Sequence, residues 1–176
     1  MSLPSLESQQ FKIEILTEHY LLAGTLEVFG LLSTYLNQAE RANFQIKQAS
    51  LSALDTDSTL SVMPMEEVWV RREEIAALRI VEGDTQGLVQ RLPIAETLRM
   101  FIPRFVIQAT MLRGTDTSMG VFFEALAGPW AAATEAQVYP LTALKATVFR
   151  EAPLLLINKR HIRFYEVVKE TGPTTH

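Results

Sequence analysis

The chain has 176 residues, of which 48% are hydrophobic and 20% are charged, so its composition is that of a globular protein and not of a disordered one. It has no cysteine, which excludes disulfides and thiolate metal sites. Its net charge of −4 argues against a protein that coats nucleic acid, because such binding depends on Lys and Arg neutralising phosphates.

The sequence also bears on location. Residues 1–7 have neither the basic nor the apolar region of a signal peptide. No apolar run approaches the roughly 20 residues that a membrane span requires. We therefore expect a cytoplasmic protein with no membrane partner.

The first predicted elements are two strands, at residues 11–16 and 20–29, where apolar and polar side chains alternate. Residues 17–19 form the turn between them. Gly24 lies in the middle of the second strand, and glycine weakens a strand unless it permits a bulge, a tight bend or close backbone approach. We expect a sharp bend at this glycine.

The rest of the first half continues with a short helix, because residues 31–36 have apolar side chains at helical spacing. Trp69 lies in a predicted strand and is expected in the core. Residues 81–87 are rich in glycine and polar residues and predict a linker. The three remaining strands are predicted at residues 44–54, 67–71 and 74–81, the last two around a tight turn.

The second half repeats this pattern. Three blocks recur in the same order, at offsets of 90, 95 and 87 residues, and the first of them matches Gly24 with Gly114. We therefore predict an internal duplication, with one unit at residues 1–84 and the other at 85–176. The matched blocks are 15–25 with 105–115, 44–53 with 139–148, and 68–80 with 155–167.

The predicted unit resembles the Sm-like barrel, the fold of the Sm and Lsm proteins and of the bacterial RNA chaperone Hfq. The residues that carry the resemblance are 68–75 and 155–162, each an apolar strand, a polar tight turn and a strand that begins with isoleucine. The resemblance implies a mainly β fold with short helices, built as two tandem Sm-like small barrels of about five bent strands each. It also implies association through strand edges into a homo-oligomer, either a dimer or a ring. RNA-binding family members have an arginine in this motif, which is kept as Arg71 but replaced by Asn158 in the second unit.

Basic residues cluster in the two turns of this motif. They are candidate contacts for RNA or single-stranded nucleic acid, with Phe164 and Tyr165 available to stack on bases. The alternative interpretation is a charged turn that protects an edge strand from aggregation. The candidate contacts are Arg71, Arg72, Lys159, Arg160 and Arg163.

Three aromatic residues near the centre of the second half are candidate interface residues. Phe122 and Phe123 are consecutive, so both cannot easily face one core, and Trp130 follows in an inserted Gly-Pro-Trp segment. Aromatic side chains are enriched at protein interfaces. We expect at least one of the three to lie at an interface.

No catalytic, cofactor or metal motif is present. The sequence lacks a phosphate-binding glycine loop and a Gly-x-Ser-x-Gly elbow, and its histidines, at positions 19, 161 and 176, have no metal-ligand spacing. We therefore expect no enzyme, no cofactor and no metal.

The leading hypothesis is a non-enzymatic interaction module that associates through β-edges, and the alternative is an RNA-binding protein. Residues 1–82 carry 6 Lys and Arg against 12 Asp and Glu, whereas residues 83–176 carry 10 against 8. These opposite net charges, −6 and +2, favour head-to-tail contacts between chains.

Overall fold

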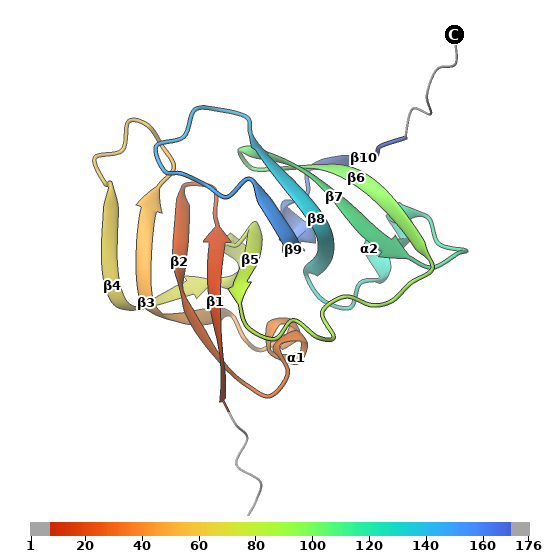
Figure 1. Cartoon of the computed structure of the whole chain (residues 1–176), viewed down its shortest axis with the longest axis horizontal. Coiled ribbons are helices and arrows are strands. Elements are labelled where there is room, and N and C mark those ends of the chain that lie inside the picture. Colours follow the sequence, from red (N-terminus) through yellow and green to blue (C-terminus); the bar gives the residue numbers. More distant parts are fainter. Residues whose placement is uncertain (1–7, 170–176) are drawn as a thin grey trace, which may run out of the picture.

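The computed structural model describes residues 8–169, and it is mainly β with two short α-helices, as predicted (Figure 1). The first half contains β1 (Ser8–Leu16), β2 (Tyr20–Phe29), α1 (Leu32–Asn37), β3 (Asn43–Ala53), β4 (Val62–Arg71) and β5 (Ala77–Glu82). The second half contains β6 (Ile94–Ile102), β7 (Phe105–Arg113), α2 (Met119–Ala125), β8 (Trp130–Pro140), β9 (Glu151–Asn158) and β10 (Phe164–Val167). A 3-10 turn, Arg72–Glu74 or Lys159–His161, precedes the last strand of each half.

All ten strands belong to one antiparallel sheet, in the order β10-β6-β7-β8-β9-β5-β1-β2-β3-β4. In each half the last strand lies beside the first, and the other three strands follow in chain order. The halves meet where β5 pairs with β9, which we call the seam, and the outer sides of β4 and β10 are the two open edges. The separate barrels of the prediction are not confirmed, because the described strands form one continuous sheet.

Elements at the same place in the order of each half begin 85 to 89 residues apart. β2 and β7 begin at Tyr20 and Phe105, and β4 and β9 end at Arg71 and Asn158. The predicted offset of 87 therefore fits the structure, and the offsets of 90 and 95 are wrong. Residues 141–148, which the 95-residue offset matched to a strand, lie between β8 and β9.

Gly24 occupies a sharp irregularity of the sheet, as predicted. The register of β2 and β3 shifts between Ala23 and Thr25, and a Cβ on Gly24 would lie 2.5 Å from Ile46 Cγ2 and 2.9 Å from the carbonyl oxygen of Lys47. The corresponding shift in β7 falls at Ala109. Gly114 lies beyond the end of β7, so its match to Gly24 was wrong.

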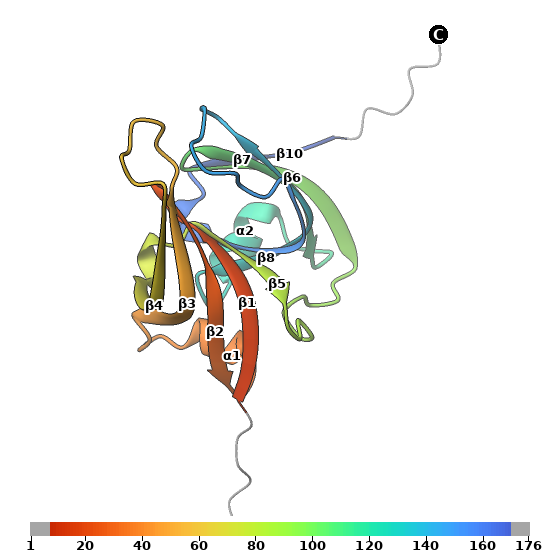
Figure 2. The same cartoon turned by 60° about the vertical axis from the view of Figure 1, so that its left-hand side comes forward.

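The two halves share their hydrophobic cores. The core cluster of the second half includes Leu16 and Ala77 of the first half, and the cluster of the first half includes Trp130 and Leu156 of the second. The loops also meet: in both views the β8–β9 loop lies beside the β3–β4 loop, where Lys145 N donates to the Leu54 carbonyl at 3.0 Å (Figures 1 and 2). Neither half is packed independently of the other.

Helices long and apolar enough to cross a membrane are absent from residues 8–169.

Candidate functional site

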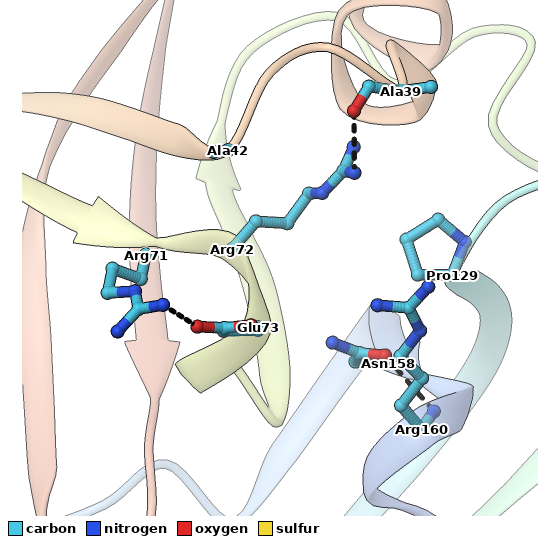
Figure 3. A pocket seen from close by; sticks show the side chains of 8 residues that line it. All are labelled: Ala39, Ala42, Arg71, Arg72, Glu73, Pro129, Asn158 and Arg160. Carbon is cyan, nitrogen blue, oxygen red and sulfur yellow. Dashed lines mark hydrogen bonds and ion pairs between the residues drawn. The ribbon is translucent and has the colours of Figure 1, made fainter.

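A cavity of about 170 Å³ lies at one end of the seam and is lined by residues of both halves (Figure 3). It brings together three of the five predicted basic residues. The lining residues are Ala39, Ala42, Arg71, Arg72 and Glu73 of the first half and Pro129, Asn158 and Arg160 of the second.

Asn158 fastens the two halves at this cavity. Its side chain is buried, its Nδ2 donates to the Ile75 carbonyl at 3.0 Å, and its Oδ1 accepts from Arg160 N at 3.1 Å. Its backbone N–H also donates to the Ala76 carbonyl at 3.0 Å. Because a buried polar group must be hydrogen-bonded, these bonds explain why the seam position holds asparagine where the open edge holds Arg71.

Arg72 and Lys159 each cap the C-terminal end of the helix in their own half. Arg72 Nη1 donates to the Gln38 carbonyl at 2.6 Å, and Lys159 Nζ donates to the Leu126 carbonyl at 2.7 Å. Both cations therefore satisfy carbonyl groups at the C-terminal end of a short helix, where positive charge is favourable. Each cation therefore uses part of its donor capacity within the chain.

The other three predicted contacts are in different surroundings. Arg71 forms an ion pair with Glu73, as Figure 3 shows. Arg160 reaches into the cavity, and among residues 8–169 no side-chain hydrogen bond or ion pair is found for Arg160 or Arg163. The cavity thus gathers two guanidinium groups that could receive an anion, with one carboxylate close by.

The predicted interface aromatics lie at contacts within the chain. Trp130 is buried, its Nε1 donates to the Leu36 carbonyl at 3.1 Å, and its ring stacks on Phe44 with centroids 6.3 Å apart. Phe122 and Phe123 are half-buried. Phe123 packs against Tyr165 with centroids 5.0 Å apart. Trp130 therefore joins the two halves.

The two open edges expose large apolar side chains. Trp69 is 60% exposed on β4, so its predicted place in the core is wrong. Its neighbours Val68 and Val70 pack against the core of the first half, so Trp69 points to the opposite face of the sheet. All four residues of β10 are exposed, including Phe164 and Tyr165.

The strand positions that are unpaired at the open edges have counterparts that are paired in the seam. In the seam Ala77, Leu78 and Arg79 face Ile157, Leu156 and Leu155. The residues 87 positions away from each of these lie on the two open edges. They are Phe164, Tyr165 and Glu166 on β10, and Val70, Trp69 and Val68 on β4.

A second set of polar contacts, away from the cavity, also joins the two halves. Asp55 of the first half pairs with Arg104 of the second half and accepts from His19 Nδ1 at 3.0 Å. The hydrogen bond from His19, assisted by the charge of Arg104, holds the pKa of Asp55 below its ordinary value.

In the part of the chain that the structure describes, no three metal-ligating side chains come together. No protein-family model matches the chain, and no significant match is found among curated proteins or solved structures.

Proposed function

We propose that the protein is a non-enzymatic assembly module whose copies associate head to tail, with β10 of one copy against β4 of the next. The observation that carries this proposal is the equivalence of the seam and the open edges. We also interpret the two halves as copies of one unit that resembles the Sm-like fold, since they share their order of elements and their strand pairing.

The open edges have the chemistry of a strand-pairing surface. An edge strand presents unpaired backbone N–H and C=O groups, and a second strand satisfies them. Natural edges are blunted by proline and charge, which in β4 occur as Pro64, Glu66 and Glu67, whereas Val68–Val70 carries neither. Pairing in the seam uses the equivalent stretch of β9.

Apolar burial adds to the backbone pairing. In the register of the seam, Tyr165 of one copy faces Trp69 of the next, and Phe164 faces Val70. Burying a large apolar side chain contributes roughly 1.5–3 kcal/mol. The opposite net charges of the two halves favour the same head-to-tail encounter.

Sedimentation velocity over a range of protein concentrations tests the association. We expect a concentration-dependent oligomer that Trp69→Glu or Tyr165→Glu converts to monomer, because each places a charge in the new pair. Leu141→Glu is the control, since Leu141 is 57% exposed but lies on neither open edge. A wild-type monomer at every concentration and salt level would overturn the proposal.

Disulfide formation tests the register, because the chain has no cysteine of its own. Trp69→Cys mixed with Tyr165→Cys should cross-link, since residues directly opposite in antiparallel strands have Cα atoms about 4.5–5.5 Å apart. Trp69→Cys mixed with Val167→Cys is the matched control, with a diagonal separation of about 7–8 Å. Preferential cross-linking of the control pair would exclude the seam register while leaving association itself intact.

A second candidate function is the binding of RNA or single-stranded nucleic acid at the junction cavity. The observation that favours it is the presence of Arg71 and Arg160, from different halves, on one cavity. Binding should weaken steeply with salt, and Arg71→Glu combined with Arg160→Glu should abolish it, because these are the two cavity arginines that do not cap a helix. No retardation of RNA at low salt would exclude this candidate.

A further inference from the structure

A second cavity, of about 270 Å³, lies between α1, α2 and the linker that joins the halves. Side chains of both halves and of the linker form its walls, and most of them are apolar. The walls include Leu36, Leu88, Leu112, Phe122, Leu126 and Trp130. This cavity is separate from the open edges and from the basic cavity.

Hydrogen bonds hold several of these walls in place. Trp130 is fixed by its bond to the Leu36 carbonyl, and the end of α2 is fixed by the bonds of Lys159 to the Phe123 and Leu126 carbonyls. A cavity with such fixed walls does not close by collapse, and an empty apolar cavity loses the contacts that its lining atoms would otherwise make.

Three polar side chains line this cavity, those of Ser33, Asn37 and Gln90. Asn37 is an exposed residue; its Nδ2 donates to the Ser33 carbonyl at 2.9 Å, whereas its Oδ1 receives no hydrogen bond from any described residue. The Oδ1 atom lies in the space that a side chain at Gly128 would take, so the absence of a side chain there makes room for the amide.

We propose that this cavity binds a small, mainly apolar molecule, of the size of a bicyclic aromatic ring, with one hydrogen-bond donor directed at Asn37 Oδ1. Apolar cavities of about 150 Å³ bind benzene, and pockets for drug-sized ligands begin near 300 Å³, so the volume suits a ligand between these sizes. Because the walls come from both halves, an occupant would stabilise the junction.

The probes are indole and benzothiophene, which have the same shape but differ in the N–H donor, and the readout is two-dimensional amide NMR of the full chain. We expect saturable shifts confined to the cavity, above all at the Trp130 indole N–H and the Gly128 amide. Asn37→Ala should weaken indole about 2–10-fold, the value of one hydrogen bond, and leave benzothiophene unchanged.

Two variants separate binding in the cavity from binding elsewhere. Ala132→Met fills the cavity from β8 and should abolish the shifts. Leu88→Ala removes part of the linker wall and should weaken both probes; because Leu88 also packs against the core of the first half, the amide spectrum of this variant must first show that it is folded. Unsaturated shifts spread over the surface, or undiminished binding in a folded Ala132→Met variant, would overturn the proposal. None of these results depends on whether copies of the chain associate.

Discussion

The seam and the open edges are built from equivalent positions but have opposite exposure. Leu78 and Leu156 face each other in the seam and are 0% and 2% exposed, whereas Tyr165 and Trp69 are 38% and 60% exposed at the edges. One chain thus contains the same strand positions both paired and unpaired. The difference teaches that strand pairing decides whether these positions are buried, and it is the basis for proposing that the outer aromatics form a pairing surface.

The largest expected effect comes from breaking the seam itself. Leu156→Ala should lower the free energy of unfolding by about 2–5 kcal/mol, because it leaves a cavity between the two halves. Trp69→Ala is the matched change at the open edge and should alter it by only a few tenths of a kcal/mol in the dilute monomer. Urea denaturation at low protein concentration measures both, and equal losses would contradict the comparison.

A smaller effect is expected at the polar end of the seam. Asn158→Ala should cost about 1–3 kcal/mol, because the buried Ile75 carbonyl loses its donor. Arg71→Ala changes the equivalent residue at the open edge, where the ion pair with Glu73 is exposed, and should cost less than about 1 kcal/mol. Thermal unfolding of the two variants at equal concentration measures both losses of stability. A greater loss in Arg71→Ala than in Asn158→Ala would contradict the comparison.

The smallest effect concerns pH. The pKa of Asp55 is lower in the folded protein than its ordinary value of 3.8, so its contribution to stability is complete above that value and is lost as the pH falls below it. Asp55→Asn should therefore flatten the acid limb of the stability curve and leave stability at pH below the folded pKa unchanged. Unfolding midpoints measured from pH 7 to 2 test this, with Asp57→Asn as the control. An unchanged acid limb would mean that the link to Arg104 and His19 does not contribute.

Local features of the fold could be predicted from the sequence because they depend on neighbouring residues. The bounds predicted for β2 agree with the structure, and so does the irregularity at Gly24, which requires only that a side chain would collide with the next strand. The first offset was wrong because it was set by matching Gly24 with Gly114, which lies outside β7; it differs from the observed 85 by five residues, an odd shift that exchanges the two faces of a strand. The second was wrong because it matched strand β3 mostly to residues 141–148, which form a loop.

The site was harder to predict because its contacts join distant residues. Arg72 reaches a carbonyl group 34 residues away in sequence, so its capping of α1 left no local pattern. Trp69 has the alternation of a core strand, and only the order of the sheet shows that β4 is at the edge. A pattern of apolar residues predicts that one face of a strand is buried, but it does not indicate whether the same chain or another chain covers that face.

The strand order has a consequence for stoichiometry. Each chain offers one β4 edge and one β10 edge, which are different surfaces, so the proposed contact has a direction and copies add in one polarity. A closed assembly would contain an even number of five-stranded units whatever the number of chains, and an assembly that fails to close would grow as a filament. A chain damaged at only one edge, such as Trp69→Glu, would still add to one end of the series and then stop it, so substoichiometric amounts should terminate assembly of the wild-type protein.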